Sequence, residues 1–266
     1  MRTSQLPSPE EMRVLRAAAV PIVAQHVLDG RGFAVLRLPW DDSMYVDALA
    51  TGTAVLAASV GSLLDQDYDG TTIVHVRDLG HRLEDGARYH ETNASGTLHT
   101  DGPQLENPPN LLFMACFSRA QDGGDSLLAS SVTLHHQLSQ IRPDLLATLH
   151  GKFHFDRRGF CEIDGETTLQ KPIFACSSQG ITFRYLYEYI LDGHAKANVP
   201  LSSQQRDAIG ALQDLLSRDD LLLKIGLDPG EVLIVNNSRV CHGRTAFRDR
   251  VAPGSVRHLI RLWAVA

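Results

Sequence analysis

The sequence has little cysteine, and its cysteines do not form a recognisable motif. The four of them, Cys116, Cys161, Cys176 and Cys241, are far apart, and no two have the C-x-x-C spacing. This pattern argues against a zinc knuckle or a thiol redox motif, and it indicates a reducing compartment.

Long apolar runs and an excess of basic residues are also absent. No run approaches the roughly 18 apolar residues that a membrane-spanning helix needs, so we expect no membrane partner. Residues 1–6 lack the apolar core of a signal peptide, so we expect a cytoplasmic protein. The net charge of −6 excludes a broadly basic surface, and we expect no nucleic-acid partner.

The size and composition are those of an ordinary globular protein. The chain has 266 residues, of which 43% are hydrophobic and 21% are charged. It has no internal repeat, low-complexity tract or linker. We therefore expect a single domain over residues 1–266, since β-sandwiches and barrels often reach this size with one core. The sequence leaves the oligomeric state open and is compatible with a homo-oligomer.

The predicted secondary structure is mixed but mainly β. Helices are predicted over 8–28, 41–60, 132–140, 143–150 and 202–217, and short strands over 33–38, 71–76, 98–102, 111–117, 126–129, 152–156, 172–176, 181–187, 231–235 and 258–264. Many short strands with helices at the start and in one insertion indicate a distorted barrel or jelly roll. Residues 77–95 show no period and could form a lid over a site.

The most informative stretch is 98–102, which contains His99 and Asp101. If it is a strand, these two side chains point to the same face. His242, 141 residues after Asp101, would complete a set of two histidines and one carboxylate. That set is typical of non-haem Fe(II) oxygenases. An H-x-D pair is common by chance, however, and an isolated histidine is more often a surface or capping residue.

Two arginines near the C-terminus strengthen this interpretation. In an extended strand Arg257 and Arg261 face the same side, about 13 Å apart. A buried guanidinium is costly unless it meets an anion, typically a carboxylate. The pair therefore predicts two carboxylate sites, and the alternative is two surface arginines on an edge strand.

These motifs, in this order, resemble the TauD/TfdA superfamily, which includes taurine dioxygenase-like and clavaminate synthase-like enzymes. The resemblance runs from about His99 to the C-terminus. It rests on His99-Thr100-Asp101, Gly123-Gly124-Asp125-Ser126, Asn237-x-Arg239-x-x-His242-Gly243-Arg244 and Arg257-His258-Leu259. Each motif alone is weak, but four of them in sequence are specific.

The resemblance implies a double-stranded β-helix and a non-haem dioxygenase that uses Fe(II), 2-oxoglutarate and O2. It implies that His99, Asp101 and His242 bind the iron and that Arg257 and Ser126 bind 2-oxoglutarate. Arg261 corresponds to a position that binds an anionic group of the substrate in some members.

Three further positions are open to more than one interpretation. Arg184, within a predicted strand, either binds substrate or pairs with a carboxylate. Asn93, with Tyr89 and His90, either contacts substrate from a lid or belongs to a solvated loop. His135 and His136, adjacent on a predicted helix, are expected at the surface because neighbouring helix positions do not share a face.

The function predicted from the sequence is hydroxylation of an unactivated carbon in a small polar substrate. An amino acid or another carboxylate-bearing metabolite fits best, and a role in specialised metabolism is compatible with this. Two alternatives stay open: the same iron site could serve desaturation or cyclisation, or the chain could be a non-catalytic, cupin-like metal-binding protein. Arg257 argues against the latter. Because Asp101 fills the carboxylate position, a halogenase is not expected.

Overall fold

The computed structural model describes residues 9–41, 43–67, 69–81, 91–159, 165–177, 180–249 and 256–266. Tyr89 and His90 lie outside these residues, as does Ser8 at the start of the first predicted helix. Among the helices of the described part, none is long and apolar enough to cross a membrane.

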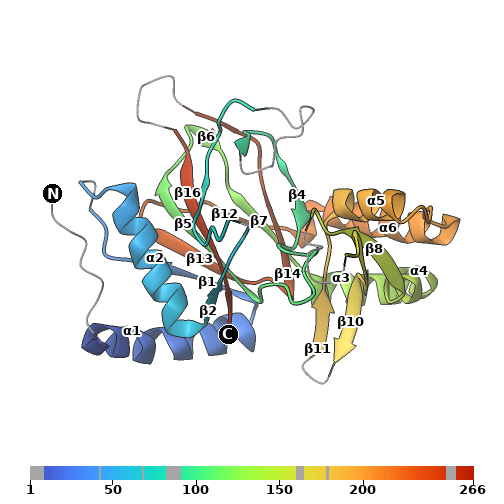
Figure 1. The fold of residues 1–266 in the computed structure, drawn as a ribbon, viewed down its shortest axis with the longest axis horizontal. Helices are drawn as coiled ribbons and strands as arrows, with labels where there is room; N and C mark the ends of the chain where they lie inside the picture. The colour runs from blue at the N-terminus through green and yellow to red at the C-terminus, as the bar shows by residue number, and fades with distance from the viewer. Residues whose placement is uncertain are drawn as a thin grey trace.

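Two antiparallel sheets form the centre of the molecule (Figure 1). The large sheet has the order β1-β13-β5-β16-β2 with β3 also paired to β16, and comprises β1 (Phe33–Arg37), β2 (Ser62–Leu64), β3 (Val74–Val76), β5 (Leu111–Ser118), β13 (Glu231–Asn236) and β16 (His258–Val265). The small sheet has the order β12-β7-β14-β4, and comprises β4 (Gly96–His99), β7 (Ser126–Ser130), β12 (Leu223–Ile225) and β14 (Val240–Arg244).

Side chains alternate along these strands and divide the core into layers. On β16, Leu259 and Trp263 join a buried cluster that also contains Leu128 of the small sheet. Ile260 and Leu262 point the other way, into a cluster with the N-terminal helices. The strands thus bury residues on both faces, as period-two alternation requires. Two antiparallel sheets packed face to face confirm the predicted jelly roll.

The N-terminal helices cover the outer face of the large sheet. They are α1 (Pro9–Ile22), which continues as the π-helix η1 (Val23–Leu28), and α2 (Val46–Val60). The first helix was predicted as one α-helix to residue 28, but its last six residues are π-helical. Pro21 lies just before the change, and it has no N–H for an i→i−4 hydrogen bond. The second helix, predicted from residue 41, begins at Val46.

A second helical layer covers the outer face of the small sheet, on the side opposite α1 and α2 (Figure 1). It is inserted between β7 and β12, and comprises α3 (Ser131–Ile141), α4 (Pro143–Leu149), β8 (Lys152–Asp156), β9 (Thr168–Pro172), β10 (Phe174–Ser177), β11 (Gly180–Phe183), α5 (Tyr187–Lys196), α6 (Ser203–Leu216) and η4 (Asp219–Leu221). Leu98, Ala129 and Cys241 of the small sheet point into its core. Two short strands, β6 (Asp122–Gly123) and β15 (Phe247–Arg248), pair beside the sheets.

The sequence missed several elements of this insertion and of the small sheet. The predicted strand over 181–187 ends at Phe183, and Tyr187 begins α5 instead. Strands β9 and β14 were not predicted. By contrast, the helix predicted over 202–217 is present as α6, and it begins with a capping box in which Ser202 and Gln205 bind each other's main-chain N–H.

Candidate metal centre

His99 ends β4 at a β-bulge that turns its side chain inward. His242 of β14 is paired with His99, but Arg244 is paired with Gly96, so β4 contains one extra residue. A bulge of this kind re-aims the side chains that follow it. Leu98 therefore points outward into the helical insertion, whereas Gly96 and His99 both line the interior cavity.

Asp101 is not on the same strand as His99, which corrects the sequence argument. Strand β4 ends at His99, and Asp101 lies in the bend that follows. The two side chains still converge, with His99 Nε2 and Asp101 Oδ1 3.5 Å apart. His242 Nε2 lies 3.8 Å from Asp101 Oδ2. The three residues were therefore correctly grouped, but a bulge and a bend bring them together instead of strand alternation.

The main chain of Asp101 is held by Asn237. The Asn237 Oδ1 atom accepts from Asp101 N at 2.8 Å, and its Nδ2 donates to the carbonyl of Asp101 at 2.8 Å and to that of Pro109 at 2.9 Å. Asn237 is 2% exposed, so these bonds are shielded from water. The bend after β4 is thereby attached to the turn that precedes β14.

The carboxylate of Asp101 is held by two residues of β16. Trp263 Nε1 donates to Oδ2 at 2.8 Å, and Arg261 Nη1 lies 3.4 Å from Oδ1. Burial alone would raise the pKa of Asp101, but the charge of Arg261 and the hydrogen bond with His99 outweigh it, so this pKa stays well below its ordinary value. The residue is therefore an anion in the folded protein.

Both histidines present a ligand nitrogen to Asp101. His99 Nδ1 lies 2.6 Å from the carbonyl of Thr97, which places the ring hydrogen on Nδ1 and leaves the Nε2 lone pair free for a metal. Burial, and then the neighbouring His99, lowers the pKa of His242 to about 3, so its ring is neutral. One nitrogen from each ring and one carboxylate oxygen lie within 4.8 Å of one another. This donor set fits the facial triad of a non-haem iron site.

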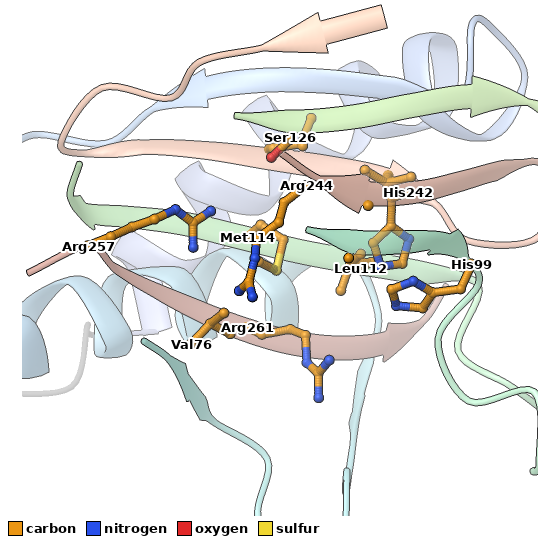
Figure 2. A pocket seen from close by; sticks show the side chains of 13 residues that line it. Val76, His99, Leu112, Met114, Ser126, His242, Arg244, Arg257 and Arg261 are labelled. Atoms are coloured by element: carbon orange, nitrogen blue, oxygen red, sulfur yellow. The ribbon is translucent and has the colours of Figure 1, made fainter. Parts of the chain in front are cut away.

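The two histidines of the triad lie at one end of a cavity between the two sheets, and arginines lie along it (Figure 2). Arg257 is at the opposite end from His99 and His242, and Arg244 lies between them. Apolar residues complete the walls, namely Val76, Leu112, Met114, Leu233 and Val235. Because apolar walls exclude water, any charge placed in this cavity interacts strongly with the arginines.

Arg257 has a buried donor that meets no acceptor. Its Nε and Nη2 atoms donate to the carbonyl of Gly124 at 3.1 and 2.8 Å, and its guanidinium lies over the ring of Phe247. Its Nη1 atom is buried and has no partner among the described residues. Burial, and then the charge of Arg244, lowers the pKa of Arg257 to about 10. An anion in the cavity would satisfy this group.

The close contact with Arg257 requires a glycine in the Gly123-Gly124 turn. Gly124 has a φ of +75°, and a Cβ atom there would lie 2.5 Å from Arg257 Nε. Glycine therefore serves both the backbone conformation and the close approach of the arginine. Ser126, two residues later, lines the same cavity and is paired with Arg244 across the small sheet.

Arg244 is a site residue that sequence reasoning did not assign. Its side chain lines the cavity and donates to the carbonyls of Thr92 and Ala94. Burial lowers its pKa. The available signal was an arginine two residues after His242, which strand alternation places on the same face as that ligand.

Arg261 also lines the cavity, beside the triad rather than beside Arg257. Its Nε donates to Gln66 Oε1 at 2.7 Å, and its guanidinium lies over the ring of Trp263. Gln66 in turn donates to the carbonyl of Arg261 at 3.0 Å. The acidic partner of Arg261 is therefore the proposed metal ligand Asp101.

Arg184 and Asn93 do not line the cavity. Arg184 follows β11 and donates to the carbonyls of Pro103 and Leu105, both at 2.6 Å. Burial lowers its pKa to about 10. The side chain of Arg184 thus contacts the loop that follows Asp101. Its hydrogen bonds there are to main-chain carbonyls and not to a carboxylate. The side chain of Asn93 is exposed.

Comparison with known proteins finds a family match over almost the entire chain. The model of the family described as "Taurine catabolism dioxygenase TauD, TfdA family" matches residues 12–263. The match extends well beyond the C-terminal part that the motifs covered, and it includes the N-terminal helices.

The individual relatives have low sequence identity to this chain. The chain is 28% identical to FR-33289 synthase of Streptomyces rubellomurinus over 88% of its own length and 69% of that protein. It is 28% identical to enduracididine beta-hydroxylase of Streptomyces hygroscopicus, over 69% of this chain and 54% of that one. A solved structure of asparagine oxygenase with Fe(II), 2S,3S-3-hydroxyasparagine and succinate has the same fold, with a TM-score of 0.74, 18% identity, and coverage of 99% of this chain and 86% of that one.

Proposed function

Because this chain belongs to the TauD/TfdA family and is a non-haem Fe(II)- and 2-oxoglutarate-dependent dioxygenase, we propose that it hydroxylates an unactivated carbon of a small amino acid or a related carboxylate-bearing metabolite. The main support is the layout of the cavity. A triad of metal-ligand type lies at one end, and a buried arginine with an unpartnered donor lies at the other.

The iron would be held by His99, Asp101 and His242. When bound, it supplies the oxidation that couples decarboxylation of 2-oxoglutarate to hydroxylation of a C–H bond. Trp263 and Arg261 hold the carboxylate of Asp101 in one orientation, and the Thr97 carbonyl does the same for the ring of His99. These outer contacts fix the ligand atoms before the metal arrives.

The cosubstrate would lie along the cavity between the triad and Arg257. Its distal carboxylate would accept from Arg257 Nη1, and the Ser126 hydroxyl would add a second donor. Arg244 adds positive charge at the middle of the cavity, which favours a dianion over a monoanion. The apolar walls keep water away from the reacting carbon.

The substrate would place a carboxylate near Arg261. This guanidinium lines the cavity at the metal end, and Gln66 fixes its orientation. A carboxylate held there would leave the neighbouring carbons of a small amino acid close to the triad. Two of the similar proteins have names that refer to amino acids, enduracididine beta-hydroxylase and asparagine oxygenase, and this supports the same substrate class.

A substrate screen tests the proposal. The purified protein is supplied with Fe(II), 2-oxoglutarate and ascorbate, and succinate and product mass are followed for a panel of amino acids, other small carboxylates, and the matching amines and amides that lack a carboxylate. We expect at least one of them to stimulate succinate release and to gain one oxygen atom. A product that has instead lost two hydrogen atoms would indicate desaturation or cyclisation at the same iron site. Stimulation only by substrates without a carboxylate would overturn the substrate class.

A further inference from the structure

A second cluster of metal-binding side chains lies outside the cavity, in the helical insertion. It consists of His135 on α3, His150 directly after α4, and Cys176 on β10. One ligand atom from each residue lies within 4.8 Å of the other two. None of the three lines the cavity that contains the triad.

The distances are close to those of a tetrahedral zinc site. The two Nε2 atoms of His135 and His150 are 3.1 Å apart. With zinc–nitrogen bonds of about 2.0–2.1 Å and a zinc–sulfur bond of about 2.3 Å, ligand nitrogens lie about 3.3 Å apart and nitrogen lies about 3.6 Å from sulfur. The two nitrogens therefore already lie near the spacing that zinc requires, and the sulfur of Cys176 lies within 4.8 Å of a nitrogen of each ring. His136, the neighbour of His135, is exposed as the sequence predicts, whereas His135 is partly buried, so the prediction of a surface position was wrong for it.

The surroundings orient the two imidazoles and favour the neutral form of His135. The ring of the buried Phe174 lies 5.3 Å from that of His135 and 6.1 Å from that of His150, measured between centroids. Burial, and then His150, lowers the pKa of His135, which favours the neutral form that a metal requires. Cys176 is exposed, so its sulfur is accessible to a metal from solvent.

We propose that His135, His150 and Cys176 form a zinc site, distinct from the iron site, with three protein ligands and water at the fourth position. Two imidazole nitrogens and one thiolate suit Zn²⁺, whereas Mg²⁺ and Ca²⁺ prefer oxygen ligands. Zinc binding would deprotonate Cys176 and release that proton to solvent.

Zinc at this position would fasten three elements of the insertion to one another. It would join α3 and α4 to the hairpin of β10 and β11. Beyond β11, the carbonyl of Tyr185 accepts from the main-chain N–H of Thr100, next to Asp101. The zinc site would therefore stabilise the segment that supports the bend carrying the iron ligand.

Spectroscopy with Co²⁺ as a zinc substitute tests the thiolate ligand directly. The metal-free full-length protein is titrated with Co²⁺, and the sulfur-to-cobalt charge-transfer absorption in the near ultraviolet is recorded. The iron triad has no sulfur ligand and does not produce this band. We expect the band in the unmodified protein, in His136→Gln and in Cys161→Ser, and its loss in Cys176→Ser. No band in the unmodified protein, or a band that persists in Cys176→Ser, would overturn the proposal.

Zinc stoichiometry gives an independent result and protects against a misfolded variant. After saturation with Zn²⁺ and gel filtration, we expect two zinc ions per unmodified chain, one at each site. Cys176→Ser and His150→Gln should each retain one, and Asp101→Ala should also retain one, at the cluster. Zinc should also raise the thermal midpoint of Asp101→Ala but not that of Asp101→Ala with Cys176→Ser. If Asp101→Ala binds no zinc while circular dichroism shows it folded, the cluster is only a pair of hydrogen-bonded histidines beside a thiol.

Discussion

The two ends of the cavity differ in how completely the protein satisfies its own charges. At the metal end, the carboxylate of Asp101 already accepts from Trp263 and lies beside Arg261. At the far end, Arg257 keeps a buried donor that no described acceptor meets. The metal end is thus assembled in advance, whereas the far end is complementary to an anion that must come from outside. Substitutions at the two ends should therefore impair different properties of the enzyme.

The largest effect is expected at the triad. Replacing His99, Asp101 or His242 with alanine removes one of three protein ligands, and Fe(II)-dependent turnover should be abolished. Succinate formation measures this, and iron analysis of the anaerobically loaded protein shows whether metal is lost. His136→Gln, a substitution of an exposed histidine, is the control. Full turnover by the double variant Asp101→Ala, His242→Ala would refute the assignment.

At the far end, Arg257→Ala should impair 2-oxoglutarate use and leave iron binding intact. Removing one partner of a buried arginine–carboxylate pair costs about 2–5 kcal/mol. The KM for 2-oxoglutarate should then rise about 30-fold or more. Ser126→Ala should cost less, about 1.5–3 kcal/mol, because it removes one hydrogen bond to a charged group. Arg248→Ala, which removes an exposed arginine paired with Asp122, is the matched control. An unchanged KM in Arg257→Ala would place the cosubstrate elsewhere.

The variant Arg261→Ala tests binding of the substrate separately from binding of 2-oxoglutarate. The side chain of Arg261 is 16% exposed, and its guanidinium already interacts with Asp101. We therefore expect a smaller effect, about a tenfold rise in the substrate KM. Without a well-held substrate, succinate should form in excess over hydroxylated product. Arg261→Lys retains the charge and should recover part of the coupling. If both the substrate KM and the succinate-to-product ratio stay unchanged, Arg261 is structural.

Trp263→Phe tests whether the metal end is set in place by its outer contacts. The substitution retains most of the buried ring but removes the hydrogen bond to Asp101 Oδ2. Loss of such a contact lowers metal affinity by about 10–100-fold, and we expect about tenfold because the Asn237 bonds to the Asp101 main chain remain. Anaerobic Fe(II) titration measures this. An unchanged iron affinity would mean that the bend after β4 positions Asp101 without help from β16.

The smallest effect concerns His258, which lies beside Arg257 in sequence but outside the cavity lining. Its ring nitrogen is 2.8 Å from that of His75. Burial, and then His75 and Arg77, lowers the pKa of His258 to about 4 from an ordinary 6.5. The unfolded chain therefore binds more protons between these pH values, and the free energy of unfolding falls as the pH drops through this window.

Replacing His258 with glutamine should make that pH dependence shallower. We expect a difference on the order of 1 kcal/mol between pH 6.5 and pH 4. Urea unfolding of the metal-free protein across this range measures it, and the contribution of the iron ligands cancels between the two proteins. Parallel pH profiles would show that His258 has the same pKa in the folded and the unfolded protein.

The sequence predicted the residues of the metal end better than the reason for their arrangement. His99 and Asp101 were placed together by alternation along one strand, and His242 was added as a distant second histidine, yet a bulge and a bend bring the first two to His242. A bulge depends on pairing with a distant strand, and local sequence does not reveal it. Arg244 was missed for a related reason, because β14 was not recognised as a strand.

The helical insertion was the least predictable part. Arg184 was expected on a strand, but the chain leaves β11 one residue earlier and the side chain meets loop carbonyls. The pairing of His135 with His150 depends on how α3 and α4 pack, which their separate periodicities do not determine. In the large sheet, β5 and β13 were well predicted because each is a continuous apolar run, whereas the short strand β2 was not predicted.

The most direct test of the account is an anaerobic titration of 2-oxoglutarate into the Fe(II)-loaded protein. The weak visible charge-transfer band of the iron–2-oxoglutarate complex reports the triad and the far end of the cavity together. We predict that the band forms in the unmodified protein and in Arg248→Ala with similar midpoints. In Arg257→Ala its midpoint should move to about 30-fold or more higher 2-oxoglutarate. A band with the same midpoint in all three proteins would contradict the proposed position of 2-oxoglutarate between the triad and Arg257.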